Sequence, residues 1–243
     1  MDRYLRPTAL LDHRHPGLRE LIAARGWADL DATDGIGAVY TFVRDEIAFG
    51  YNAADDVPAS TVLADGYGQC NTKTTLLMAL LRGIGVPVRF HGATVHKRLQ
   101  RGVVPGPLYP LAPADIVHSW AEVRHQDRWV GLEGVILDSA YLDGIRSTVA
   151  TGRTAAFLGY GVGTEDLADP PITWTGTDTA IQATGVTDDH GVHDDPDTFY
   201  RAHGTNLTGP RAWLFRHWVR HAMNRNVAGI RAAGTTPADR LAT

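Results

Sequence analysis

The sequence contains a single cysteine, Cys70, among its 243 residues, so an intrachain disulfide scaffold is excluded. It also lacks long apolar runs. The stretch 76–81 is among the longest, far short of the roughly 18 to 20 residues that a transmembrane helix needs. The first residues are charged before any apolar core of a secretory signal can form. With only one cysteine, these features lead us to expect a cytoplasmic protein without a membrane span.

Basic residues are absent from one long segment. Between residues 154 and 200 there are nine acidic residues and no Lys or Arg, whereas residues 201–243 carry seven Arg and one Asp. We expect the acidic segment to fold against the basic one, with an acidic protein partner as the alternative. The basic segment interleaves its arginines with Trp213, Phe215 and Trp218, which we expect to pack into the core. No nucleic-acid-binding module is recognisable, so we expect no nucleic-acid partner.

The remaining composition is that of a globular chain. Hydrophobic residues make up 44% and charged residues 21% of the sequence, and the length suits one core with an appended element. We expect residues 1–153 to form the core with its N-terminal helices. Residues 154–243, a loop-rich acidic segment and a basic C-terminal helix, would pack on the same domain.

Hydrophobic periodicity predicts a mixture of helices and strands. Residues 139–208 have weak periodicity and predict mainly extended loops. The other expected elements are helices at 16–25, from Thr33 or Asp34 to about 50, at 70–82 and at 210–233, strands at 86–90, 117–123 and 128–133, and a long proline-rich loop at 97–115.

Cys70 lies where a reactive thiol is expected. It follows Gly66 and Gly68 and opens the apolar helix 70–82. The unpaired N–H groups and the dipole of a helix N-terminus favour an anion, so the thiolate form is stabilised there. The glycines would let a substrate approach. Cys70 is therefore a candidate nucleophile.

His118 is the leading candidate for the base that a thiol nucleophile needs. In a strand, His118, Trp120 and Glu122 share one face. If the hairpin pairs residue 122 with 129, the same register places Glu133 opposite His118, where its carboxylate can orient the ring. An ordinary cross-strand polar pair is the alternative interpretation.

Several blocks of this sequence together resemble the transglutaminase-like superfamily. The blocks, spread over roughly residues 36–138, are Ala59-Ser60-x-Val62-Leu63, Gly66-x-Gly68-x-Cys70, Leu81-Arg82-x-x-Gly85-Val86-Pro87-Val88-Arg89, His118-x-Trp120-x-Glu122-Val123 and Trp129-Val130-x-Leu132-Glu133. The resemblance implies an α+β, papain-like fold in which the nucleophile helix packs on an antiparallel sheet, with a C-terminal helix added here. It also implies Cys70 as nucleophile, His118 as general base and acid, and Glu133 as the third member of a catalytic triad. The family usually has Asp followed by Pro at this position, so Asp138 is an alternative acid.

These groups suit acyl chemistry. A thiolate attacks an amide or thioester carbonyl, and water or an amine then resolves the acyl-enzyme. The activity expected is that of a cysteine hydrolase, such as a peptidase or amidase, or of an acyltransferase; a catalytically silent binding module is the alternative. The oxyanion could be held by the Cys70 backbone N–H and by a side chain of Gln69, Tyr67 or Trp120.

We expect neither a cofactor nor a metal ion. His91 and His96 could join His118 in a three-histidine site, but their spacing matches no zinc pattern. The long segments 97–115 and 154–200 are expected to border the acyl site, because functional clefts are commonly walled by long loops.

Overall fold

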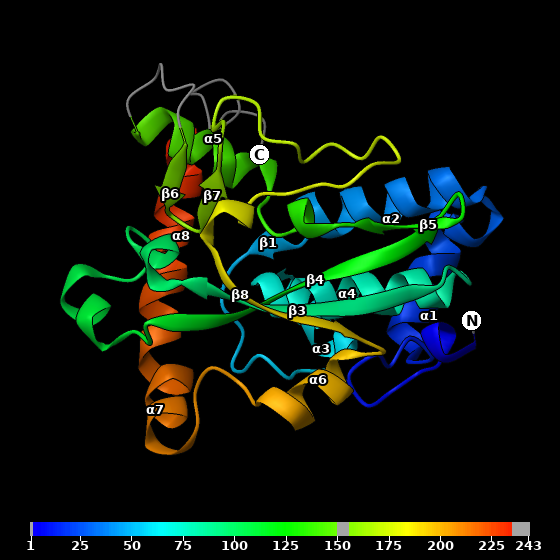
Figure 1. Ribbon diagram of the computed structural model, residues 1–243, viewed down its shortest axis with the longest axis horizontal. Coiled ribbons are helices and arrows are strands. Elements are labelled where there is room, and N and C mark those ends of the chain that lie inside the picture. Colours follow the sequence, from blue (N-terminus) through cyan, green and yellow to red (C-terminus); the bar gives the residue numbers. More distant parts are fainter. Residues whose placement is uncertain (1, 150–155, 235–243) are drawn as a thin grey trace.

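The computed structural model of the chain describes residues 2–149 and 156–234 (Figure 1). The helices are α1 (Pro16–Arg25), α2 (Ala32–Asp45), α3 (Ala59–Asp65), α4 (Cys70–Gly83), α5 (Ser139–Thr148), α6 (Pro196–His203), α7 (Gly209–Leu214) and α8 (Arg220–Gly234). The strands are β1 (Ala48–Phe49), β2 (Tyr67–Gly68), β3 (Val88–His96), β4 (Asp115–His125), β5 (Arg128–Gly131), β6 (Phe157–Gly159), β7 (Val162–Thr164) and β8 (Val186–His193). Within these residues, no helix is both long and apolar enough to cross a bilayer.

The main sheet is antiparallel and has the strand order β5-β4-β3-β8. Its edge strand β8 comes from late in the chain and pairs with β3. Helix α4 packs against β3 and β4 on one side and against α1, α2 and α3 on the other. The expected α+β architecture, with the Cys70 helix packed on an antiparallel sheet, is confirmed.

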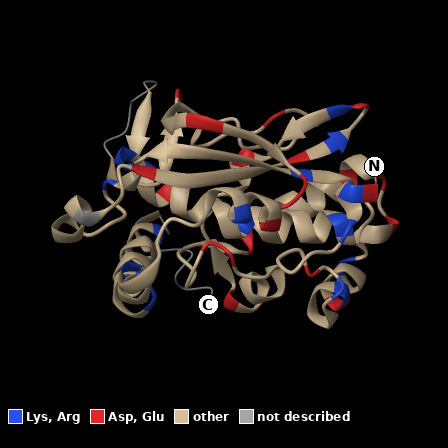
Figure 2. Ribbon diagram, turned by 60° about the horizontal axis from the view of Figure 1, so that its bottom comes forward, with Lys and Arg blue, Asp and Glu red and all other residues tan. Residues whose placement is uncertain are grey.

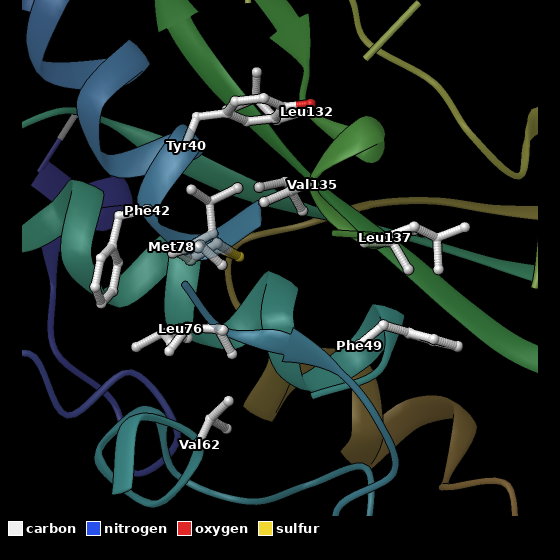
Figure 3. Close-up of a cluster of buried hydrophobic side chains, with 14 of the residues drawn as sticks. Tyr40, Phe42, Phe49, Val62, Leu76, Met78, Leu132, Val135 and Leu137 are labelled. Carbon is white, nitrogen blue, oxygen red and sulfur yellow. The ribbon is translucent and has the colours of Figure 1, made fainter. Parts of the chain in front are cut away.

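Helix α4 is the centre of the core because its sequence is apolar or small on nearly every side. All residues from Asn71 to Arg82 are buried. Figure 3 shows side chains from α2, α3, α4 and the segment after β5 meeting in one cluster, which includes Tyr40, Phe42, Val62, Leu76, Met78, Leu132, Val135 and Leu137. A close-packed helix of this kind holds its first residue, Cys70, in a fixed place.

Helix α2 forms on the predicted apolar stripe, but its boundaries differ from those predicted. Its N-cap is Asp31, and the predicted N-cap at Thr33 or Asp34 is wrong. The Asp31 carboxylate accepts hydrogen bonds from the backbone N–H groups of Thr33 and Asp34. The helix ends at Asp45, because the chain then enters β1, which pairs in parallel with β2. That pair leads directly into the Cys70 helix.

The hairpin register predicted from the sequence is wrong. The turn consists of Gln126 and Asp127, with φ of 44° and 61°, so His125 pairs with Arg128 and Glu122 with Gly131. Two left-handed residues form the tight primed turn that a twisted hairpin favours. The pairing is shifted by two residues, and β5 ends at Gly131, before Glu133. A shift of two keeps every side chain on its predicted face.

Helix α5 was not predicted. It begins after Asp138, whose carboxylate accepts a hydrogen bond from the Tyr141 N–H, and it packs on α8. The two helices approach closely at Gly144, where a Cβ atom would lie 2.0 Å from the Ile230 carbonyl oxygen. A mid-helix glycine weakens the helical signal in the sequence, which explains the omission.

The C-terminal helix is present as predicted, but its tryptophans do not enter the core. Helices α7 and α8 are joined by a π-helical turn, Phe215–Val219. Trp213 and Trp218 are 61% and 68% exposed, and Leu214 is 45% exposed. The opposite face of the helix, with Met223, Val227 and Ile230, is buried instead. The predicted core packing of Trp213 and Trp218 is therefore wrong.

Among the described residues, the acidic segment does not fold against the basic one through ion pairs. Within residues 156–234, no ion pair joins an acidic residue of the segment before 200 to an arginine of the C-terminal helix. Asp194 pairs with Arg3, Asp189 with His91, and Arg231 with Asp138. The charged residues of α7 and α8, at the left of Figure 2, are all basic.

Candidate active site

Cys70 is the first residue of α4 and is half-buried at the edge of a cavity of about 790 Å³. The preceding turn positions it. Gly66 has a φ of 70° and ends α3, and Gly68 leaves room for the first turn of α4, because a Cβ atom there would lie 2.7 Å from Thr72 Oγ1. Gly68 is therefore explained by packing under Cys70. The N-terminus of α4 lines this end of the cavity with Gln69, Cys70 and Asn71.

A polar network beside Cys70 was not foreseen from the sequence. The buried carboxylate of Asp55 accepts hydrogen bonds from the side chains of Gln69 (3.3 Å), Asn71 (3.1 Å) and Asn206 (2.9 Å) and from the Asn206 backbone N–H (3.0 Å). Asn71 also donates to the Val117 carbonyl oxygen at 3.1 Å. These bonds tie the start of α4 to β4 and to the segment before α7. Asp55 and Asn206 carry no local motif that would have marked them.

His118 and Glu133 meet directly. His118 lies on β4 and is fully buried, and its Nε2 atom lies 3.1 Å from Glu133 Oε1. Glu133 is 5% exposed and opens a short 3-10 turn after β5. Its side chain reaches His118 across the two-residue offset, so the contact predicted from the sequence forms in a different register.

Cys70 also acts on the His118 ring. In the part of the chain that the structure describes, the buried Nδ1 atom has no hydrogen-bond partner. Burial alone would lower the pKa of His118, but Cys70 and Glu133 together outweigh it and raise the pKa to about 9. His118 is therefore set to hold a proton at neutral pH, next to the sulfur.

Glu133 is itself fixed by backbone donors from the distant segment 180–182. Its carboxylate accepts hydrogen bonds from the Ile181 N–H and from the Gln182 N–H, the latter at 2.9 and 3.0 Å. The same segment lies along the hairpin, because the Glu133 N–H donates to the Thr179 carbonyl oxygen at 3.2 Å. Backbone donors leave no mark in a sequence, so this support could not be predicted.

Asp138, the alternative acid, is engaged elsewhere. Its carboxylate pairs with Arg231 at 2.7 Å, caps α5 and accepts a hydrogen bond from the Phe49 N–H at 2.7 Å. Burial would raise the pKa of Asp138, but Arg231 more than compensates and keeps it below its usual value. Asp138 therefore connects α5, α8 and β1, whereas the carboxylate at the His118 ring is that of Glu133.

The three candidate oxyanion side chains are placed differently. Gln69 lines the cavity with Cys70, although its Oε1 accepts from the Asn52 N–H at 3.0 Å and its Nε2 donates to Asp55. The Tyr67 hydroxyl accepts from Arg220 at 3.2 Å. The Trp120 ring stacks on His91, with ring centroids 4.1 Å apart. Of the three, only Gln69 borders the cavity.

The cavity is walled from two sides. The connection between β3 and β4 supplies Leu99, Leu108 and Pro113, which agrees with the expectation for 97–115. Of the described residues of the acidic segment, Gly161 and Gln182 line the cavity. The other wall is the C-terminal helix from Arg211 to Met223, which was not predicted to reach the site. In Figure 1 this helix lies beside the β3–β4 connection.

The histidines considered as metal ligands have other partners. His91 Nδ1 lies 2.5 Å from Glu122 and its Nε2 lies 2.7 Å from Asp189, while His96 accepts a hydrogen bond from the Arg98 N–H. Among the described residues, no three His, Cys, Asp or Glu side chains are grouped to hold a metal ion.

The α+β fold thus holds a half-buried thiol, Cys70, a buried histidine, His118, and a buried carboxylate, Glu133, in this order along the chain. A comparison with protein families matches residues 23–133 to the transglutaminase-like superfamily, which confirms the resemblance found from the sequence. The matched residues 23–133 contain all three side chains.

Two further comparisons add little detail. No curated protein matches the chain. A solved structure from Cytophaga hutchinsonii, described as a candidate cysteine protease, aligns at 12% identity with a TM-score of 0.46. The alignment covers 81% of this chain and 47% of that one, so this chain spans about half the length of that structure.

Proposed function

We propose that this protein is a cysteine-dependent enzyme that cleaves or transfers an acyl group through an acyl-enzyme on Cys70. The observation that carries the proposal is the His118 ring, with one nitrogen on the Glu133 carboxylate and a pKa raised to about 9 by Cys70 and Glu133 against the effect of burial. A charged imidazole beside a thiol at a helix N-terminus is the arrangement that nucleophilic thiol catalysis requires.

In the proposed mechanism, the Cys70 sulfur attacks the carbonyl carbon of an amide or thioester. The carbon–sulfur bond forms, and the bond to the leaving group breaks as His118 gives that group its proton. Glu133 holds the ring in place and stabilises its charged form. The Cys70 backbone N–H and the Gln69 side chain are the proposed donors to the oxyanion.

The second half of the proposed reaction decides the enzyme class. His118 takes a proton from water or from an amine, which attacks the acyl carbon and releases Cys70. Water gives a cysteine protease or amidase, and an amine gives an acyltransferase. In this scheme the core 1–153 supplies the reacting groups and the segment 154–243 supplies one cavity wall. A lone thiol suits a reducing compartment, and we place the activity in the cytoplasm.

The test is turnover of a panel of amide and thioester substrates by the wild-type protein and by two variants. Cys70→Ala is expected to abolish turnover, and His118→Ala to reduce it by at least two orders of magnitude. Folding of each variant is checked by circular dichroism and thermal unfolding. A folded wild-type protein that turns over nothing, with an unreactive Cys70, would favour the catalytically silent binding module.

A partner for the C-terminal helix is a separate proposal. Trp213, Leu214 and Trp218 are exposed among arginines, and the described residues 201–234 contain no Asp or Glu. We propose an acidic protein segment as the partner. Poly-glutamate should change tryptophan fluorescence in low salt, and this change should be lost in Trp213→Phe/Trp218→Phe. Equal responses to poly-glutamate and poly-lysine would contradict the charge argument.

A further inference from the structure

The cavity at Cys70 is lined by polar and apolar residues. The polar groups gather near the thiol, where Asp55, Gln69 and Asn71 form their network. Apolar side chains from elements far apart in sequence also line the cavity. The β3–β4 connection supplies Leu99, Val104 and Leu108, beside Gln100, and the C-terminal helix supplies Phe215, Val219 and Met223, beside the exposed Arg211 and Arg216. All six apolar side chains pack against the hydrophobic clusters of the protein or belong to them.

The buried lining offers no free charge to a ligand. Asp55 is 9% exposed, and both of its carboxylate oxygens already accept hydrogen bonds from Gln69, Asn71 and Asn206. The other charged lining residues, Asp56, Arg211 and Arg216, are exposed. A charged group placed deep in this cavity would lose its hydration without gaining a counter-charge.

The cavity is also larger than one amino-acid side chain requires. At roughly 30 Å³ for each water-sized group, an eight-carbon chain occupies on the order of 240 Å³. The volume of about 790 Å³ accommodates such a chain and the reacting carbonyl together. Pockets of this size and polarity bind most of the surface of a small organic ligand.

We infer that the cavity binds an extended apolar acyl chain, so that the substrate class is an ester, thioester or amide whose acyl group is a medium-length hydrocarbon. The inference rests on the proposed function for its chemistry, but the binding part stands on the cavity alone. The carbonyl carbon lies at Cys70, and the chain runs between Leu108 and Val219. Longer chains gain affinity by leaving water for these apolar walls.

The first experiment measures binding without turnover. Cys70 of the wild-type protein is alkylated with iodoacetamide in the presence of acetamide, butanamide or octanamide. Octanamide is expected to protect Cys70 at concentrations at least tenfold lower than butanamide does. Protection that is independent of chain length overturns the inference, whatever the catalytic result.

The second experiment measures turnover of p-nitrophenyl acetate, butyrate and octanoate. The carbon–sulfur bond forms as p-nitrophenolate leaves, and water then releases the carboxylic acid. We expect kcat/KM to rise at least tenfold from acetate to octanoate. If neither these esters nor the panel of amides and thioesters reacts but octanamide still protects Cys70, the proposed function fails and the binding inference holds.

Variants locate the chain in the cavity. Val219→Trp fills one wall and should reduce protection by octanamide at least tenfold. It should also lower the ratio of kcat/KM for octanoate to kcat/KM for acetate at least tenfold. Ala228→Trp adds the same side chain to the exposed face of α8, outside the lining, and should change neither. Leu108→Arg, on the opposite wall, is the second variant if Val219→Trp does not fold. An equal loss for acetate and octanoate would contradict the placement.

Discussion

Replacement of Glu133 by Gln should lower the pKa of His118 by at least one unit. In the wild-type protein, this pKa is raised to about 9 from its usual 6.5, although burial alone would lower it. An opposite charge within hydrogen-bond distance typically shifts a pKa by about 1 to 3 units, and Glu133 lies 3.1 Å from the ring. One unit corresponds to about 1.4 kcal/mol of interaction with the charged ring. In the variant the midpoint should fall to about 8 or below.

The assay is titration of the His118 ring by NMR, together with unfolding measured against pH. A raised folded-state pKa means that the stabilisation is fully present below about pH 6.5 and is lost as the pH rises through about 9. Glu133→Gln should shrink this loss. The single oxygen of the Gln side chain cannot accept from both the Ile181 N–H and the His118 ring, and the loss of one of these bonds should cost about 1 to 3 kcal/mol of stability.

The matched control is Glu122→Gln. Glu122 lies on β4, the strand that carries His118, and its carboxylate contacts another histidine, His91, at 2.5 Å. Burial opposes protonation of His91, but Glu122 and Asp189 raise its pKa. This variant should lower the pKa of His91 and leave that of His118 unchanged. A His118 midpoint that is the same in wild type and Glu133→Gln would refute the reasoning.

Two other predictions concern stability. Asp138→Asn should lower the free energy of unfolding, measured in urea, by about 3 kcal/mol, because it breaks the ion pair between Asp138 and Arg231, whose side chains are 4% and 25% exposed. The rate of Cys70 alkylation should stay within twofold of wild type. A larger loss of alkylation than in Glu133→Gln would make Asp138 the acid. Lys73 is buried, and desolvation lowers its pKa from 10.5 to about 7. Between these two pH values the unfolded chain binds more protons than the folded one, so Lys73 makes the free energy of unfolding rise with pH. Lys73→Met should therefore lack a rise of about 2 kcal/mol that the free energy of unfolding of the wild type shows between pH 7 and pH 9. An unchanged rise in the variant would show that Lys73 is charged in the folded state.

The helix and strand periodicities were strong enough to predict α1, α2, α4 and the β4–β5 hairpin. The His118–Glu133 contact was predicted through an incorrect register, and it survived because an even shift preserves the faces of the strands. The resemblance to a family supplied the order of Cys70, His118 and Glu133, which periodicity alone could not.

Other parts of the site arise from contacts that a sequence does not encode locally. Asp55 and Asn206 are distant in sequence and meet only in the folded chain. The Ile181 and Gln182 donors belong to the backbone. The C-terminal helix presents apolar residues to the cavity and tryptophans to solvent, and the sequence pattern alone did not distinguish the two faces. The π-helical turn at Phe215–Val219 also disturbs the regular period there.

The central claim is that Cys70 carries the acyl group. The most direct measurement is mass spectrometry of the intact protein and of its peptides after brief incubation with a reactive thioester or p-nitrophenyl ester. The account predicts one acyl adduct, located on the peptide that contains Cys70 and absent from Cys70→Ser. Turnover without any adduct on Cys70, or turnover that persists in Cys70→Ser, would contradict it.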